Sequence, residues 1–232
     1  MTLRERLAAI DERVAAAAHA AGRDPASITR VVVTKFHPPA LIRDLRELGV
    51  HDIGENRQQE FSAKVDELHD LADLRWHFIG QVQTNKTRAI ARAAHSVALT
   101  LHTVDRAKLA TALDRALAEE DAGTLDVLVQ VNLTDDAGRG GAAPADAEAL
   151  ATAVAACAHL RLRGVMAVAP LGEPPAPAFA RLARVAETVR SVVPEASWIS
   201  AGMTGDFEEA IAAGATHLRI GSAITGNRPA HG

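Results

Sequence analysis

A lysine closes the first strongly apolar run of this sequence. Lys35 directly follows Val31-Val32-Val33-Thr34. A charged amine is costly to bury, so a lysine is unusual in such a place. Burial favours the neutral form of an amine, and that form attacks a carbonyl to make an imine. Lys35 is therefore the first candidate for chemistry, the alternative being a lysine whose side chain reaches out to solvent.

Two glycine-containing segments near the end of the sequence could bind an anion. The segment Ser200–Asp206 reads Ser-Ala-Gly-Met-Thr-Gly-Asp and precedes a predicted short helix over Phe207–Ala213, and Arg219–Ser222 reads Arg-Ile-Gly-Ser. Glycines before a helix start let backbone N–H groups point at an anion. Asp206 and Glu209 have the spacing of a capping box. The pattern predicts a phosphate site, the alternative being two ordinary glycine turns.

Further polar residues follow the second and third apolar runs. Asn56 is placed to reach a ligand, whereas Glu55 and Glu60 equally suit a solvated first helical turn. His77 is expected to serve packing and not catalysis. The ten histidines lack metal-ligand spacing, so we predict no metal. A polar loop at the edge of the site is predicted from Gln81, Gln83, Asn85 and Lys86.

Short apolar runs alternate with longer amphipathic segments along the whole sequence. Strands are predicted over Arg30–Lys35, Val50–Gly54, Arg75–Ile79, Ser96–Leu101, Leu125–Val131, Leu162–Val168, Ser197–Ser200 and His217–Ile220. Helices are predicted over segments such as Ala40–Leu48, Arg57–Leu68, Asp105–Leu117, Ala145–Ala156 and Ala178–Val192. This alternation indicates βαβ units and a parallel sheet.

The fold predicted from these elements is an α/β fold, a single (β/α)8 barrel of the TIM type. Eight strands in a chain of this length suit such a barrel, which typically takes about 250 residues. An open doubly wound sheet is the alternative, but it requires a glycine-rich fingerprint after the first strand, where this sequence has Lys35-Phe36-His37-Pro38-Pro39. A barrel collects the carboxyl ends of its strands at one mouth, which would bring Lys35 and the glycine segments together.

Composition bounds the class of protein. The 232 residues are 48% hydrophobic with a net charge of −4, which indicates one domain over residues 1–232 and no nucleic-acid or membrane partner. Residues 2–18 have helical spacing with interspersed charges, so we expect an extra N-terminal helix and not a signal peptide. Cys157 is the only cysteine, which excludes an intrachain disulfide. We expect a soluble, cytoplasmic monomer.

The sequence resembles the pyridoxal phosphate homeostasis protein family. The similarity rests on an ordered set of motifs that runs through most of the chain, and the stretch Trp76–Lys86 is its most specific part. The other matching segments are Val32–Lys35, Ile53–Asn56, Gln59-Glu60, Val131-Asn132, Leu162–Met166, Ser200–Asp206 and Arg219–Ile224. The sequence departs from the family pattern at Arg57-Gln58, at Ala201 and in the loop 135–141, and none of these positions is the lysine or a phosphate glycine.

The resemblance implies a fold like the N-terminal barrel of alanine racemase and a bound pyridoxal 5′-phosphate. Carried onto matching positions, Lys35 would form the Schiff base, Arg219 would face the pyridine nitrogen and Asn56 would contact the cofactor. The residues implied to hold the phosphate are Ser200, Gly202, Met203, Thr204, Gly221 and Ser222.

The resemblance implies a cofactor carrier without an established reaction of its own. The racemase reaction uses a tyrosine base and a second domain, whereas this sequence contains no tyrosine. We therefore expect a protein that buffers pyridoxal phosphate or delivers it to apo-enzymes. The alternatives are a weak pyridoxal phosphate enzyme, such as a racemase or transaminase, and a class I aldolase that forms its imine directly with a sugar phosphate.

Overall fold

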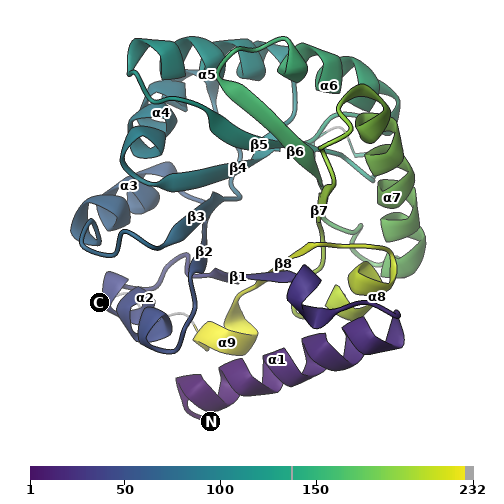
Figure 1. The fold of residues 1–232 in the computed structure, drawn as a ribbon. Coiled ribbons are helices and arrows are strands. Elements are labelled where there is room, and N and C mark those ends of the chain that lie inside the picture. The colour runs from purple at the N-terminus through teal and green to yellow at the C-terminus, as the bar shows by residue number, and fades with distance from the viewer. Residues whose placement is uncertain (137, 228–232) are drawn as a thin grey trace.

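Eight parallel strands form a closed barrel in the computed structural model, which describes residues 1–136 and 138–227 (Figure 1). Each strand pairs with its neighbour in the sequence, and β8 closes the ring against β1. The prediction of a (β/α)8 barrel is therefore confirmed. The strands are β1 (Thr29–Val33), β2 (Asp52–Glu55), β3 (Arg75–Phe78), β4 (Ala98–Val104), β5 (Leu125–Gln130), β6 (Leu160–Met166), β7 (Trp198–Ser200) and β8 (His217–Ile220).

Helices surround the ring of strands, as Figure 1 shows. An extra helix, α1 (Leu3–Ala20), precedes the first strand and packs on α8 and α9, as the sequence pattern predicts. Thr2 and Glu5 form a capping box at its start. The other helices are α2 (Pro39–Glu47), α3 (Gln58–Glu67), α4 (Thr87–Ser96), α5 (Ala107–Glu119), α6 (Ala147–Ala155), α7 (Pro175–Val192), α8 (Phe207–Ala212) and α9 (Ser222–Thr225), and short 3-10 turns cover Pro25–Ser27, Thr84–Lys86 and Pro144–Asp146.

Two local features differ from the sequence-based expectations. The first strand ends at Val33, so Lys35 lies in the turn beyond it and not in the strand. Phe36 has φ of 68°, a left-handed conformation that cannot continue a strand. The helix α4 was not among the predicted segments, because its Thr-Arg-Ala-Ile-Ala-Arg-Ala-Ala-His-Ser sequence has only one large apolar residue.

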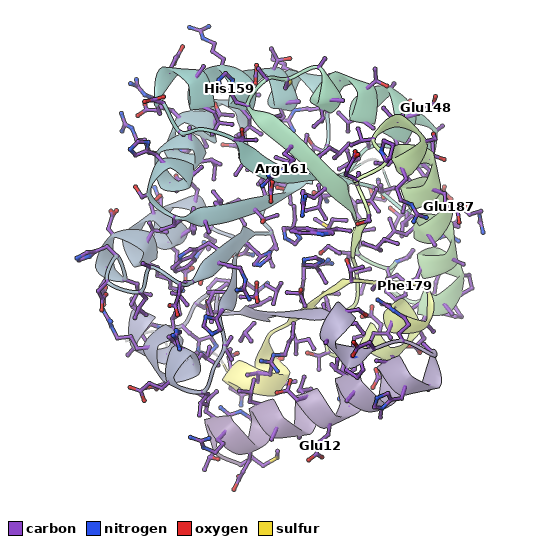
Figure 2. All side chains as sticks on the ribbon, viewed as in Figure 1. Glu12, Glu148, His159, Arg161, Phe179 and Glu187 are labelled. Atoms are coloured by element: carbon purple, nitrogen blue, oxygen red, sulfur yellow. The ribbon has the colours of Figure 1, made fainter. Side chains whose placement is uncertain are left out.

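Side chains alternate between two environments along β3. Trp76 and Phe78 point toward the helices, where both rings pack against Phe61 of α3 at centroid distances of 5.6 and 5.5 Å. His77 between them points into the barrel. The apolar core therefore lies between strands and helices, while the space inside the ring is filled by side chains that include several polar ones (Figure 2). Among the described residues, no helix is long and apolar enough to cross a membrane.

Candidate functional site

Four neighbouring strands, in the order β7, β8, β1 and β2, carry the predicted site residues to one mouth of the barrel. Lys35 follows β1, Asn56 follows β2, and Gly221 follows β8. A Cβ atom added at Gly221 would lie 3.6 Å from the carbonyl oxygen of Val33. Because β8 pairs with β1, the second glycine segment lies beside the end of the strand that leads to the lysine. Active sites of (β/α)8 barrels form at this carboxyl-terminal mouth.

The amine of Lys35 rests over an aromatic ring. Lys35 is half-buried, and its Nζ lies 5.9 Å from the centroid of the Phe36 ring. The guanidinium of Arg57 lies 5.5 Å from the centroid of the same ring. Cation–π contacts of this kind are worth about 0.5–1 kcal/mol at exposed sites. The Lys35 amine is thus held only weakly by the Phe36 ring, so a ligand that reacts with the amine can replace this contact.

The first glycine segment requires glycine at its centre. Gly202 has φ of 91°, and an added Cβ would approach Phe207 Cα to 2.9 Å and Ala210 Cβ to 2.8 Å. The expected capping box is wrong, because Asp206 makes no side-chain cap bond to the helix. Its Oδ1 instead accepts the Met203 N–H at 2.6 Å, since the tight turn presents that donor to it.

Several backbone donors of the two glycine segments remain available at the mouth. Within residues 1–136 and 138–227, no acceptor in the protein takes up the N–H groups of Thr204, Gly221 or Ser222. The Met203 N–H is already used by Asp206, and the side chain of Met203 is 38% exposed. Available N–H groups on adjoining turns form the concave arrangement that binds anions.

Ser200 and Arg219 are joined to each other inside the barrel. Arg219 is buried, and its Nη1 donates to Ser200 Oγ at 2.7 Å while Nη2 donates to the carbonyl oxygen of Ala167 at 2.9 Å. Burial lowers the pKa of Arg219 to about 10, so the guanidinium stays charged near neutral pH. The hydroxyl of Ser200 therefore lies beside the guanidinium, and its predicted contact with a phosphate stays a prediction.

A row of polar side chains continues from Ser200 toward the opposite mouth. Ser200 Oγ lies 2.9 Å from His102 Nδ1, His102 Nε2 lies 2.9 Å from His77 Nδ1, and His77 Nε2 lies 3.0 Å from Asp52 Oδ1. Arg75 Nε donates to the same carboxylate oxygen at 2.9 Å. The row, which we call the interior chain, links Arg219 to the amino-terminal mouth of the barrel. It gives His77 a structural place, as the sequence predicts.

The charge states along the interior chain follow from burial and contact. Burial, followed by the neighbouring charges of His77, His217 and Arg219, lowers the pKa of His102 well below its usual value. Burial alone would raise the pKa of Asp52, but the hydrogen bonds from His77 and Arg75 outweigh it and lower that pKa. The chain therefore begins at an ionised carboxylate and ends at an ionised guanidinium, with a neutral His102 between them.

The last residue of β2 and the residue that follows it each provide an unpaired oxygen atom. Asn56 Oδ1 and Glu55 Oε2 are buried, and neither has a hydrogen-bond partner in the described part of the chain. Buried polar atoms are rarely left unpaired, so each needs a partner from a ligand, water or a proton. Asn56 is one of the predicted ligand contacts, and its free oxygen is consistent with that role.

Glu55 is not part of a solvated helical turn, and that alternative is wrong. Glu55 is 0% exposed, and burial raises its pKa against the opposing effect of Lys64. Lys64 Nζ donates to Glu55 Oε1 at 2.6 Å and to Glu60 Oε1 at 2.9 Å. Lys64 was not among the predicted site residues. Its signal was the spacing of four residues between Glu60 and Lys64 on one helix face.

A separate cavity of about 480 Å³ borders the mouth near α3 and α4. Its lining includes Arg57, Glu60, Gln81, Gln83 and Lys86. Most of the predicted polar loop thus lies at the edge of the mouth, as the sequence analysis expects. The cavity adjoins the turn of Lys35 through Glu60, which accepts the Phe36 N–H at 2.6 Å.

The donors at the mouth match a small molecule with three features. Available backbone N–H groups suit a phosphate, the Lys35 amine suits a carbonyl carbon, and the buried guanidinium of Arg219 suits an acceptor such as a ring nitrogen. The unpaired Asn56 oxygen adds an acceptor for a hydroxyl. Within the described residues, no group of His, Cys, Asp and Glu is arranged to hold a metal ion.

Comparison with known proteins gives consistent results. The family described as "Alanine racemase, N-terminal domain" matches residues 6–229. The pyridoxal phosphate homeostasis protein of Pseudomonas aeruginosa is 42% identical over 229 residues, covering 98% of this chain and 96% of its own. The protein of that name from Escherichia coli K12 is 37% identical, covering 96% of this chain and 95% of its own. The structure of PipY from Synechococcus elongatus PCC7942 with pyridoxal phosphate bound has a TM-score of 0.82 at 34% identity, covering 96% of this chain and 99% of that one.

Proposed function

Because this chain belongs to the alanine racemase N-terminal domain family, and within it to the pyridoxal phosphate homeostasis proteins, we propose that it binds pyridoxal 5′-phosphate as a Schiff base on Lys35. In this role it buffers the reactive aldehyde in the cell and delivers the cofactor to apo-enzymes. The observation that carries the proposal is the pairing of β8 with β1, which places the turn after β8 beside the end of the strand that leads to Lys35.

The residues at the mouth fit this cofactor. The N–H groups of Thr204, Gly221 and Ser222 would take the phosphate, with Gly202 and Met203 shaping the turn beside it. Asn56 would pair its orphaned oxygen with the ring hydroxyl. When bound, the cofactor supplies an aldehyde. The Lys35 amine adds to its carbon, and the aldehyde oxygen leaves as one water with the two amine protons.

The electrostatics at Arg219 favour a carrier over a strong catalyst. Arg219 keeps its proton at neutral pH, so it would donate a hydrogen bond to the pyridine nitrogen and leave that nitrogen without a proton of its own. An unprotonated ring is a poorer electron sink. The sequence also contains no tyrosine to act as a racemase base. Both observations support storage and delivery of the cofactor without turnover.

Reductive trapping tests the assignment directly. The purified protein is mixed with pyridoxal phosphate, reduced with borohydride and digested, and the labelled peptide is identified by mass spectrometry. The chain has four lysines, Lys35, Lys64, Lys86 and Lys108, so each can be resolved. We expect the label on Lys35 alone, its loss in Lys35→Ala and its retention in the control Lys86→Ala. A label on another lysine would overturn the proposal.

The competing activities predict different results from the same material. A weak amino-acid enzyme would turn over at least one substrate in a broad panel of amino acids, and Lys35→Ala would abolish that turnover. An aldolase would show no visible imine chromophore in the protein as purified. We expect a coloured adduct and no turnover. Weak binding driven by the phosphate should persist in Lys35→Ala, because the N–H donors are unchanged.

A further inference from the structure

A buried ammonium lies beneath the turn that carries Lys35. Lys64 of α3 is 3% exposed, and its Nζ donates to the carbonyl oxygen of Thr34 at 2.9 Å, to Glu55 Oε1 at 2.6 Å and to Glu60 Oε1 at 2.9 Å. These contacts use all three protons of the ammonium. The ammonium of Lys64 is therefore fully bonded within the protein, and one of its partners is Thr34, the residue that precedes Lys35.

The partners of Lys64 hold the chain on both sides of Lys35. Thr34 is fixed through its carbonyl by Lys64 and through its hydroxyl, which donates to Glu55 Oε1 at 2.6 Å. On the other side, the Phe36 N–H donates to Glu60 Oε1 at 2.6 Å. Both peptide groups that flank the Cα of Lys35 are thus tied to one ionic cluster, formed by Lys64, Glu55 and Glu60.

The conformation held by this cluster is not one the chain would adopt freely. Phe36 has φ of 68°, in the left-handed region, which costs a residue with a Cβ atom about 1–2 kcal/mol. Such conformations persist only where the surroundings fix them. The bond from the Phe36 N–H to Glu60 is one of the contacts that does so. Loss of the cluster would let this turn relax and carry the amine of Lys35 with it.

We propose that Lys64, acting through Glu55 and Glu60, is a positioning residue that aims the Lys35 amine at the aldehyde of the cofactor. This inference rests on the proposed function. Lys64 Nζ bonds to Thr34, Glu55 and Glu60 and not to the Lys35 amine. Its role would be to fix the position from which the Lys35 amine adds to the aldehyde carbon. The proposed phosphate donors and Arg219 come from β7, β8 and the turns that follow them, and none of these groups bonds to the cluster, whereas the proposed ring contact at Asn56 directly follows Glu55 in the chain.

Two ligands separate positioning from general stability. Pyridoxal phosphate reports imine formation through its absorbance, whereas pyridoxine 5′-phosphate has an alcohol in place of the aldehyde and reports only ring and phosphate binding. A misplacement of about 1 Å can slow a reaction about 100-fold. For Lys64→Met we expect imine formation slower by about ten- to a hundredfold. Its affinity for pyridoxine phosphate should stay within about twofold, as for sites that share no contacts.

A pair of changes at Glu60 keeps the test decisive if Lys64→Met fails to fold. Glu60 is partly exposed, so either change should be tolerated. Glu60→Gln keeps an oxygen for the Phe36 N–H and should retain the rate of imine formation. Glu60→Ala removes that oxygen and should slow the reaction. Lys108→Met, on the exposed face of α5, is the matched control and should behave as the parent protein.

A readout without cofactor completes the design. Trace acetylation of the apo-protein, with peptide mapping, measures the reactivity of the Lys35 amine itself, and it should change in Lys64→Met and Glu60→Ala alone. Imine formation at the parent rate in folded Glu60→Ala would overturn the inference. A loss of pyridoxine phosphate affinity as large as the loss of imine formation would also overturn it. If the parent protein forms no imine on Lys35, the proposed function fails instead.

Discussion

Replacing Ser200 by alanine removes the link between Arg219 and the histidines inside the barrel. The hydroxyl of Ser200 is fully buried and is bonded to Arg219 Nη1 at 2.7 Å and to His102 Nδ1 at 2.9 Å. The methyl group of alanine satisfies neither partner. Ser200→Ala therefore leaves a guanidinium donor and an imidazole nitrogen unpaired in a buried position.

The expected loss of stability follows from those two groups. Each buried polar group left without its partner costs about 1–3 kcal/mol, so Ser200→Ala should lower the free energy of unfolding by about 2–6 kcal/mol. With a urea m-value of about 3 kcal/mol per M, a loss of about 3 kcal/mol lowers the unfolding midpoint by about 1 M. The change adds no bulk, so strain makes no contribution.

Urea unfolding followed by tryptophan fluorescence measures this loss. Trp76 and Trp198 are the two tryptophans, and Trp198 packs on His217 at the barrel wall. Ser197→Ala is the control, because Ser197 is exposed on the same segment. If Ser200→Ala unfolds within about 0.5 kcal/mol of the control, which is the usual range for surface substitutions, then Ser200 does not hold Arg219 and His102 together.

Two further predictions concern the glycines and pH. In the same urea assay, Gly202→Ala should lose about 2–4 kcal/mol of unfolding free energy, because φ is 91° at this position and the new Cβ would lie 2.8 Å from the Cβ of Ala210. Gly221→Ala should match the parent protein, because its new Cβ would lie 3.6 Å from the Cβ of Val33. Burial lowers the pKa of His217 to about 3. The unfolded chain takes up this proton below about pH 6.5, while the native protein does not, so this group should lower stability by about 2 kcal/mol between pH 7 and pH 5. His217→Gln should reduce that slope, and urea midpoints that rise on acidification would contradict the assignment.

Local signals in the sequence were sufficient for the existence and order of the strands, although the first strand ends at Val33 and not at Lys35. Apolar runs bounded by turn residues mark each strand, and the barrel topology then brings the strand ends together. The interior chain could not be predicted, because it joins His77 to His102 across 25 residues and His102 to Ser200 across 98. Only the closed sheet makes these residues neighbours.

Short-range patterns gave an incorrect partner at Asp206 and an incomplete set of partners at Lys64. Asp206 has the spacing of a capping box, but its carboxylate bonds the Met203 N–H in the preceding turn. Lys64 has the spacing of a surface ion pair with Glu60, yet Glu55 and the carbonyl of Thr34 draw it into a buried position. At Asp206 a bond in the preceding turn replaces the predicted one, whereas at Lys64 the pair with Glu60 forms and tertiary packing adds two further partners.

The two ends of the interior chain determine the direction of every hydrogen bond between them. The ionised Asp52 can only accept, so His77 donates to it from Nε2. With His77 Nδ1 as an acceptor, the neutral His102 donates to His77 and the Ser200 hydroxyl donates to His102. Reversal of the link between His102 and His77 would turn the Ser200 hydrogen away from His102, because a neutral imidazole has a single N–H to donate. The polarity beside Arg219 is therefore tied to the direction of a hydrogen bond deep inside the barrel.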